Sequence, residues 1–280
     1  MNQGQLETAL VDLSLGGIRY YGQVGSTNDE AARWVLQGAP DRSLVVANEQ
    51  TAGRGRAGRH WVTPADAALA FSLVLYPTPG EVTLLSRVTA LGALAVCDTL
   101  RRVFALPTEI KWPNDVLVAR RKVAGVLVES QWMGDCLQAF VLGIGMNVAP
   151  ASVDEMVLPA SALRFPVICL EEALGQPVDR LVLLHSILEA LFHWHSRLSS
   201  ADFMQAWEMN LAFRGEWVQV ISGGGDTQDS APVPWQQPTQ VLDGQVLGLA
   251  SDGSLKLLTR SGGIVTVQVG EISLRPLNDQ

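Results

Sequence analysis

The chain has 280 residues, of which 48% are apolar and 17% are charged, and its formal net charge at pH 7 is −8. This composition supports a packed globular core and argues against intrinsic disorder. The acidic balance argues against a protein that binds nucleic acid through a broad basic surface, although it leaves room for a local basic site.

The N-terminus and the cysteines both indicate a soluble, cytoplasmic protein. The opening segment, MNQGQLETALVDLSL, lacks the basic start and the long apolar run of a signal peptide. No stretch is long and apolar enough to span a bilayer, so no membrane contact is expected. Cys97, Cys136 and Cys169 lie far apart without CxxC spacing, and we interpret all three as reduced thiols in the core.

The first half of the chain is expected to mix helices with antiparallel strands. Residues 1–18 are too few to form a domain. A helix is expected to begin at Thr27, because Thr27 and Glu30 fit a capping box, and to end near Gly38. Apolar runs predict strands at 44–50 and 68–77, a helix at 82–104, two strands in TEIKWPNDVLV, and two more in KVAGVLVESQWM and CLQAFVLGIGMNV with a turn at Gly134-Asp135. This mixture indicates an α+β fold.

The second half begins with two expected helices, at 179–198 and 201–211. The short runs EWVQVI, TQVLDGQVLGLA, SLKLLT and GIVTVQV follow, and their Asp-Gly and Gly-Gly turns are typical of a small β-barrel. The segment 222–238 is rich in Gly, Pro and Gln, which predicts a surface loop. The expected parts are a short N-terminal extension at 1–18, a main α+β domain at 19–211 and a small C-terminal β-barrel domain at 212–280.

The segment NEQTAGRGRAGRHWVTP, residues 48–64, concentrates positive charge in an acidic chain. Its arginines, which offer planar charged groups suited to phosphate or carboxylate, are Arg54, Arg56 and Arg59. Its glycines let the backbone turn sharply and approach a ligand closely, and Trp61 can stack on a base or close a pocket. Two other interpretations stay open at this point, a solvated basic loop and an RGG-like segment that binds RNA.

Three residues downstream strengthen the case for a small-anion site. Lys111 in KWPND and Lys122 in RKVAG lie where strands begin or end, so that their side chains can line a cleft. Asn147 closes the motif GIGMN, whose glycines allow close approach of a ligand. Either lysine alone is more often an ordinary surface residue.

As a set, these motifs resemble those of the biotin protein ligases, also called biotin–[acetyl-CoA-carboxylase] ligases. The segments GSTN, EQTAGRGRAGRHW, KWPNDVLV, KVAGVLVE and GIGMNV follow one another as in that family, and the ending EISLRP is also similar. The resemblance implies a class II synthetase-like biotin/lipoate ligase domain with a mixed sheet and flanking helices, followed by a small SH3-like β-barrel. It implies an enzyme that makes biotinyl-5′-AMP from biotin and ATP, with release of pyrophosphate, and transfers biotin to a lysine of a biotin carboxyl carrier protein domain.

The resemblance also implies which residues bind biotin. Those implied at the ring, whose hydroxyls and amides suit a ureido group, are Ser26, Thr27, Asn28 and Gln50. Those implied over the carboxylate and the phosphate are Arg54, Gly55, Arg56 and Lys122. Among these, Arg56 and Lys122 are expected to be catalytic, because fixed positive charge screens two anions that must meet.

A second implied group binds the nucleotide, and its members are Arg54, Arg59, Trp61, Lys111, Asp115 and Asn147. Arg275 in EISLRP is expected either to reach toward the nucleotide or to form a salt bridge between domains. Mg²⁺ is expected to be held mainly by the phosphates of ATP, because no acidic cluster is typical of a dedicated metal site. The spacing of His185, His193 and His195 does not put all three on one helical face, so no metal site is expected there.

Partners and rival functions follow from the same comparison. The segment that precedes the ligase motifs is too short for a helix-turn-helix domain, so no specific DNA binding is expected. The chain is expected to be a monomer or a homodimer. The alternatives are a lipoate–protein ligase of similar fold, which the GRGRAGR loop disfavours, and a non-catalytic RNA- or nucleotide-binding module, which leaves Lys111, Lys122 and Asn147 unexplained.

Overall fold

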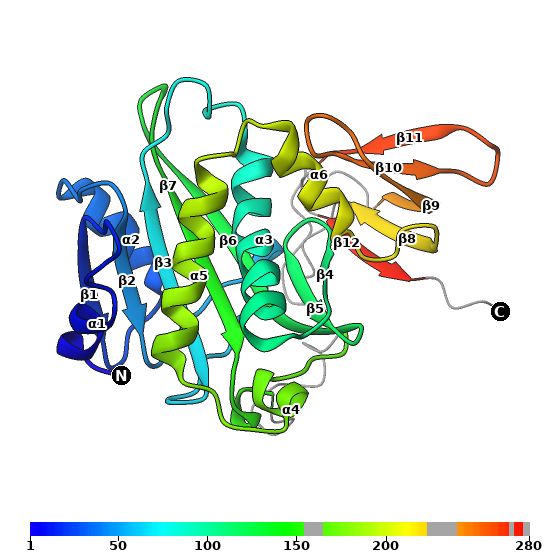
Figure 1. The fold of residues 1–280 in the computed structure, drawn as a ribbon. Coiled ribbons are helices and arrows are strands. Elements are labelled where there is room, and N and C mark those ends of the chain that lie inside the picture. Colours follow the sequence, from blue (N-terminus) through cyan, green and yellow to red (C-terminus); the bar gives the residue numbers. More distant parts are fainter. Residues whose placement is uncertain (154–164, 223–239, 269–271, 277–280) are drawn as a thin grey trace, which may run out of the picture.

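A seven-stranded mixed sheet forms the centre of the larger domain in the computed structural model, which describes residues 1–153, 165–222, 240–268 and 272–276 (Figure 1). Its strands lie in the order β1-β2-β3-β7-β6-β5-β4. Strands β1 and β2 are parallel, and the other neighbours are antiparallel. The bounds are β1 (Gly17–Tyr21), β2 (Ser43–Ala47), β3 (Ala68–Leu75), β4 (Thr108–Lys111), β5 (Asp115–Val118), β6 (Arg121–Met133) and β7 (Cys136–Asn147).

Helices cover both faces of this sheet, which confirms the predicted α+β class. Helices α3 and α5 lie side by side on one face (Figure 1). Helix α2 packs on the other face, where alternate residues of the strands, among them Val45, Val74 and Val141, meet Ala31. The helices are α1 (Gln3–Ala9), α2 (Thr27–Leu36), α3 (Leu85–Phe104), α4 (Leu170–Leu174), α5 (Arg180–His195) and α6 (Ala201–Met209), with 3-10 turns η1 (Arg56–Gly58) and η2 (Pro150–Ser152).

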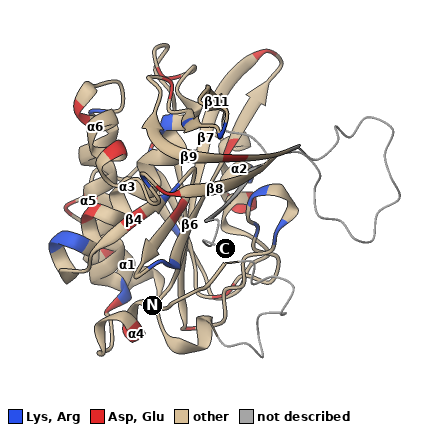
Figure 2. Cartoon of the chain, turned by 90° about the vertical axis from the view of Figure 1, so that its right-hand side faces the viewer, with Lys and Arg blue, Asp and Glu red and all other residues tan. Residues whose placement is uncertain are grey.

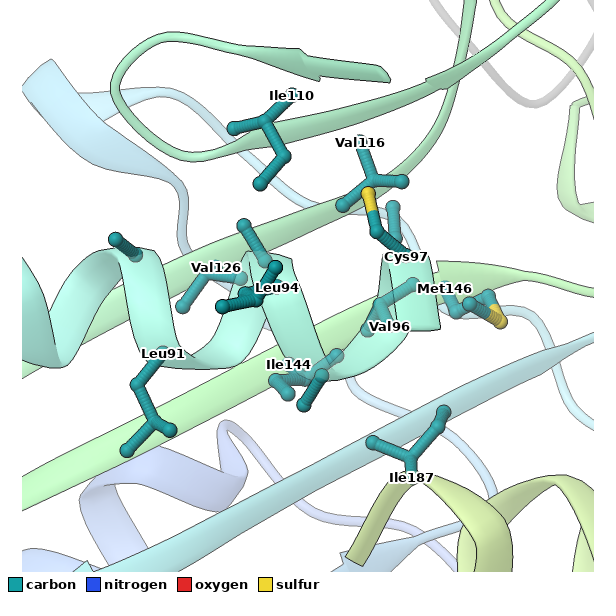
Figure 3. Close-up of a cluster of buried hydrophobic side chains, with 14 of the residues drawn as sticks. Leu91, Leu94, Val96, Cys97, Ile110, Val116, Val126, Ile144, Met146 and Ile187 are labelled. Atoms are coloured by element: carbon teal, nitrogen blue, oxygen red, sulfur yellow. The ribbon is translucent and has the colours of Figure 1, made fainter. Parts of the chain in front are cut away.

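The main core lies between α3, α5 and the sheet. Figure 3 shows Leu91 and Leu94 of α3 beside Val126 and Ile144 of the sheet, with Ile187 of α5 close by. These side chains are all buried. Helix α3 approaches β6 closely because a Cβ at Gly92 would lie 2.8 Å from Val126 Cγ1. This packing holds β6 and β7 rigidly, and their other face carries the site described below.

The C-terminal domain is a five-stranded antiparallel sheet with the order β11-β10-β9-β8-β12. Its strands are β8 (Trp217–Ser222), β9 (Gln240–Leu249), β10 (Leu255–Leu258), β11 (Ile264–Val267) and β12 (Ile272–Pro276). The predicted small β domain is therefore present. The segment 223–239, which holds nearly all of the predicted 222–238 loop, and the side chain of Arg275 lie outside the described residues.

The turn between β9 and β10 docks on the larger domain. Trp112 Nε1 donates a hydrogen bond of 3.0 Å to the carbonyl of Gly253. Ser86 and Arg87 of α3 donate to the carbonyls of Asp252 and Ser251, at 2.6 and 2.9 Å. Trp112 is among the largest fully buried side chains, so it joins the two domains through both packing and a hydrogen bond.

We expect Trp112→Ala to destabilise the protein by about 3–5 kcal/mol, the usual cost of removing a buried tryptophan. The substitution leaves a cavity and removes the donor to Gly253. Urea unfolding followed by circular dichroism measures the effect, with the exposed Trp132 (58% accessible) changed to Ala as the matched control. Equal midpoints for the two variants would contradict this role.

The turn between β6 and β7 bears on two sequence predictions. The turn at Gly134-Asp135 is confirmed, because Met133 pairs with Cys136 across it and Gly134 has φ +60°. The same position makes Cys136 exposed, so the prediction of three core thiols was wrong for this cysteine. Burial of Cys97 raises the pKa of its thiol to about 12.

The predicted capping box at Thr27 was also wrong. Ser26 is the N-cap residue, without a side-chain capping bond, and Thr27 is the first residue of α2. The backbone N–H of Thr27 donates instead to Gln50 Oε1 at 2.8 Å. Glu30 forms an ion pair with Arg33 at 2.7 Å. A side chain from a distant loop therefore replaces the local cap.

Helix α1 adds to the expected architecture. Residues 1–18 contain this helix, whose Leu6 is buried in the main core together with Leu10 just after it. The limits of the three predicted parts stay predictions. No helix among the described residues is long and apolar enough to cross a membrane.

Candidate functional site

One face of the central sheet carries small residues on neighbouring strands. Ala70 of β3, Gly145 of β7 and Gly125 of β6 are paired in register, and Asp115 of β5 continues the row. Gly143 lies two residues from Gly145 and therefore on the same face. We call Gly125, Gly143 and Gly145 the glycine floor. It lets side chains from other segments lie directly on the backbone of the sheet.

Two predicted site residues occupy this floor. A Cβ at Gly145 would lie 2.4 Å from Trp61 Cε2, and one at Gly125 would lie 3.4 Å from Trp61 Cζ3. A Cβ at Gly143 would lie 2.2 Å from Asn28 Oδ1. Because no real Cβ fits at 2.2–2.4 Å, the glycines at 143 and 145 are required by the positions of these two side chains. The glycines of GIGMN therefore accommodate two side chains of this chain, Asn28 and Trp61, while the predicted close approach of a ligand stays a prediction.

The arginine–glycine loop, residues 51–61, forms a small closed turn beside the floor. Trp61 N donates to Gly53 O at 2.9 Å, and Gly55 N donates to Arg59 O at 2.6 Å. A Cβ at Gly53 would lie 2.3 Å from the carbonyl of Trp61, so this pairing requires glycine. The turn at the tip contains Ala57 with φ 55°. The loop thereby sets Trp61 on the floor and carries three arginines between Gly53 and Trp61.

Arg54 makes contacts that the sequence did not indicate. Its Nη1 donates to both carboxylate oxygens of Asp29, each at 2.7 Å. Its Nη2 donates to both oxygens of Glu129, each at 3.0 Å. The pKa of Arg54 is raised, mainly by its hydrogen bonds to Asp29. Burial of the guanidinium acts to lower this pKa, and the charge of Glu129 raises it further. Two carboxylates thus neutralise this guanidinium, which was expected to face an anion.

The other two arginines lie closer to the tip of the loop. Arg56 is half-buried and begins the turn, whereas Arg59 is exposed and donates from Nε to the carbonyl of Arg56 at 3.0 Å. The charge of Arg59 contributes to lowering the pKa of both Lys111 and Asp115. Arg59 is therefore close enough to add its field to the lysine pair described next.

Two lysines share one buried carboxylate at the end of β4 and the start of β5. Lys122 Nζ lies 2.6 Å from Asp115 Oδ1, and Lys111 Nζ lies 3.6 Å from Asp115 Oδ2. Burial alone would raise the pKa of Asp115, but the ammonium groups of Lys122 and Lys111 hold it below the usual value. Two ammonium groups against one carboxylate leave net positive charge at this end of the floor.

Lys111 is also held against an aromatic ring. Its Nζ lies 4.1 Å from the centroid of Phe165, a cation–π contact. Burial lowers the pKa of Lys111 to about 8, against the attraction of Asp115. Lys122 Nζ similarly lies 5.3 Å from the centroid of Trp61. Through these contacts, Lys111, Asp115, Lys122 and Trp61 form one cluster, and Lys111, Asp115 and Trp61 belong to the residues predicted to bind the nucleotide.

The depressed pKa of Lys111 predicts a pH-dependent stability. Below about pH 8 the lysine is protonated in both the folded and the unfolded chain, whereas from about pH 8 to 10.5 only the unfolded chain keeps the proton. The unfolded state then binds more protons, so the contribution of this group to the free energy of unfolding rises with pH across that window. Urea unfolding at about pH 7.5 and 9.5 should show this rise in the wild type and lose it in Lys111→Met, but not in Lys256→Met. The same pH dependence in all three proteins would contradict the assignment.

A series of hydrogen-bonded polar side chains leads from the residues that flank the loop to the glycine floor. Thr27 Oγ1 donates to Gln50 Oε1 at 3.1 Å, and Gln50 Nε2 donates to Thr63 Oγ1 at 3.0 Å. Ser72 Oγ lies 2.8 Å from Thr27 Oγ1 and 2.6 Å from Asn28 Oδ1. Asn28 Nδ2 donates to Glu129 Oε2 at 2.7 Å. Ser26, Thr27 and Asn28 are all buried at the start of α2.

The structure thus brings most of the predicted residues together at the floor. Ser26, Thr27, Asn28 and Gln50 line one end, and Lys111, Asp115, Lys122 and Trp61 line the other. Asn147 is buried on the same face of β7 as Gly145, and it donates to the carbonyl of Ile168 at 3.4 Å. Gly55 lies in the arginine–glycine loop, where it is bonded to Arg59.

Sequence reasoning missed four residues that hold the site. Ser72 is the one polar residue in the strand ALAFSLVL, and Glu129 is the one acid in KVAGVLVES. A lone polar residue in a buried strand is a usable signal, since buried polar groups need partners. Asp29 and Phe165 offer no comparable signal, because their partners Arg54 and Lys111 are remote in sequence.

Charged and histidine side chains are spread over the structure. Figure 2 shows basic and acidic positions interspersed along the chain. Two of the histidines of α5 have separate acidic neighbours, since His185 contacts Asp12 and His195 contacts Glu81. Within the described ranges, no three His, Cys, Asp or Glu side chains gather as metal ligands would.

Comparison with known proteins gives one consistent result. Residues 21–147 match the Biotin/lipoate A/B protein ligase family. The chain is 36% identical over 207 residues to the biotin--[acetyl-CoA-carboxylase] ligase of Paracoccus denitrificans, an alignment that covers 72% of this chain and 84% of that protein. It is 35% identical over 170 residues to the bifunctional ligase/repressor BirA of Bacillus spizizenii, covering 60% of this chain and 50% of that protein.

A solved structure extends the similarity to nearly the whole chain. The biotin protein ligase from Aquifex aeolicus in complex with biotin and ATP superposes with a TM-score of 0.76 at 26% identity, covering 93% of this chain and 99% of that one.

Proposed function

Because this chain belongs to the biotin/lipoate A/B protein ligase family and is an ATP-dependent biotin protein ligase within it, we propose that the glycine floor is where it makes biotinyl-5′-AMP. We propose further that the biotin is then passed to one lysine of a biotin carboxyl carrier domain. The observation that carries the assignment is the arrangement of the floor, with uncharged polar groups at one end and two lysines at the other.

The polar end suits the ring of biotin. A ureido group donates two N–H bonds and accepts at its carbonyl, so it needs partners of both kinds. Ser26, Thr27 and Gln50 offer hydroxyl and amide groups there, and the bonds between Thr27 and Gln50 fix these two side chains before a ligand arrives. Asn28 has its amide oxygen and nitrogen bonded to Ser72 and Glu129, so we assign it to shaping the pocket. Lipoate lacks a ureido group, and these residues would gain little from it.

The charged end suits the two anions of the first step. The biotin carboxylate and the α-phosphate of ATP repel each other, and fixed cations lower that cost because they need no rearrangement during reaction. We assign Lys122 to both anions, and we assign Arg56, at the tip of the loop, to the same two anions. Lys111, Arg59, Trp61 and Asn147 are assigned to the nucleotide.

The two reactions balance without a nucleophile from this chain. A carboxylate oxygen of biotin bonds to the α-phosphorus while the bond from that phosphorus to the bridging oxygen breaks, and pyrophosphate leaves. The amine of the carrier lysine then bonds to the acyl carbon of the mixed anhydride, AMP leaves with its phosphate oxygen, and the nitrogen loses one proton to solvent. The protein's task is to orient, to screen charge and to exclude water.

Mg²⁺ would supply further neutralisation of the phosphate charge. Asp115 is already bonded to two lysines, and the described side chains offer no group of three acids or histidines that would hold a metal. The donor set therefore fits a cation carried by the oxygens of ATP better than one held in a protein cage, and we assign no step to a protein-held metal.

Transfer to a purified carrier domain tests the proposed acceptor. With biotin, ATP and Mg²⁺, the intact mass of the domain should rise by one biotinyl group, and a carrier whose target lysine is changed to Arg should stay unmodified. If biotinyl-AMP forms but neither carrier gains mass, the acceptor class is wrong while the adenylation stands.

A further inference from the structure

We propose that Glu129 is a positioning residue that couples the arginine–glycine loop to the biotin-ring end of the floor. This inference rests on the proposed function for the identity of the ligand, and on the hydrogen bonds of the Glu129 carboxylate for the coupling. Glu129 lies on β6, on the same face as Gly125. Its carboxylate accepts from Asn28 Nδ2 at 2.7 Å and from Arg54 Nη2 at 3.0 Å.

The two donors belong to the two parts that must be aligned. Asn28 begins α2, lies on Gly143 and is bonded to Ser72, which is itself bonded to Thr27. Arg54 is in the loop, four residues from Gln50, and its backbone pairs with that of His60. One carboxylate therefore contacts both the ring pocket and the loop that covers it.

Asp29 strengthens the loop anchor but does not provide the coupling. It accepts both bonds from Arg54 Nη1 and has no bond to Asn28. Glu129 Oε2 instead accepts from both Asn28 and Arg54. A glutamine at 129 has one acceptor oxygen, and its NH₂ group would face one of the two donors. Glu129→Gln therefore breaks the coupling with little change in volume, whereas Asp29→Asn weakens only the anchor.

This arrangement assigns Arg54 a role different from those of Arg56 and Arg59. A guanidinium held by two carboxylates contributes little net positive charge to a bound phosphate. It can hold the base of the loop while the tip carries charge to the anions. Opening of the loop then requires loss of the Arg54 bonds, and the same event removes the guanidinium that fixes the Glu129 carboxylate to which Asn28 donates.

The test measures biotin dissociation and trypsin cleavage between residues 54 and 59 in the full chain. Glu129→Gln should release labelled biotin on the order of tenfold faster and speed cleavage in the loop to a similar extent, the size expected for losing a partly exposed charge-assisted hydrogen bond. Its rate constant for adenylate formation at saturating biotin and ATP should stay within about threefold of wild type, because Glu129 contacts no reacting atom.

Two further variants make the result decisive. Glu109→Gln is the matched control, since Glu109 is also a partly exposed strand carboxylate paired with an arginine, Arg120, at 3.3 Å. Arg54→Lys keeps the charge but lacks the fork that bonds two carboxylates at once, so it should open the loop as Glu129→Gln does. Combined with Glu129→Gln it should add no further effect.

Equal dissociation and cleavage rates in Glu129→Gln and Glu109→Gln, or additive effects in the double variant, would overturn the coupling. If Glu129→Gln does not fold, the cleavage and dissociation rates of Arg54→Lys decide the question alone. Failure of the wild type to bind biotin would refute the proposed function, whereas loop cleavage would still report on the anchor.

Discussion

Lys122→Met should reduce the rate of biotinyl-AMP formation by roughly two to three orders of magnitude, the usual effect of removing one preorganised charge from a transition state. Lys122 is the cation with the shortest contact to the buried Asp115, at 2.6 Å. Asp115 keeps Lys111 as a partner in the variant, so the chain should remain folded. Single-turnover mass measurement of the adenylate gives the rate, and circular dichroism reports the fold.

The other lysine outside the cluster provides the control. Lys256 lies on β10 in the C-terminal domain, and Lys256→Met should leave the rate unchanged. A folded Lys122→Met protein whose rate stays within about threefold of wild type would contradict the assignment of this lysine to the anions.

Gly145→Ala should weaken ATP binding by about 5- to 150-fold by displacing Trp61 from the floor. The new Cβ would lie 2.4 and 2.5 Å from Cε2 and Nε1 of the indole, a rigid group that cannot yield locally. Overpacking of this kind costs about 1–3 kcal/mol, which corresponds to about 5- to 150-fold if it falls on the bound conformation.

The matched control for this substitution is Gly80→Ala, because nothing lies within 4 Å of a Cβ at that position. The KM for ATP and the KM for biotin should be measured separately. We expect the larger increase in the KM for ATP, since Trp61 is assigned to the nucleotide end. A Gly145→Ala protein with an unchanged KM for ATP would show that Trp61 does not set that end of the site.

Short segments of the sequence identified the loop and the lysines as charged groups, the family resemblance placed them at one site, and the structure brings Lys122 against Trp61 of the loop. GRGRAGR, KWPND and RKVAG each carry charge that needs a ligand or a partner. The hairpin at Gly134-Asp135 was equally predictable, since a two-residue turn is a local property. These features depend on residues that are close in sequence.

The partners of these residues could not be predicted in the same way. Arg54 is neutralised by Asp29 and Glu129, which are 25 and 75 residues away. The cap of α2 comes from Gln50, 23 residues downstream of Thr27. The capping-box pattern assigned Thr27 to capping because it considers only residues that are close in sequence, and Gln50 is not among them. Long-range pairing decides which of several chemically possible bonds a side chain makes.

The most direct test of the account is a mass measurement of the adenylate formed by the purified protein with ATP, Mg²⁺ and either biotin or lipoate. We predict biotinyl-AMP with biotin, no adenylate with lipoate, and loss of biotinyl-AMP in Arg56→Ala as well as in Lys122→Met. Lipoyl-AMP in place of biotinyl-AMP, or no adenylate from either acid, would contradict the assignment of the glycine floor to biotin activation.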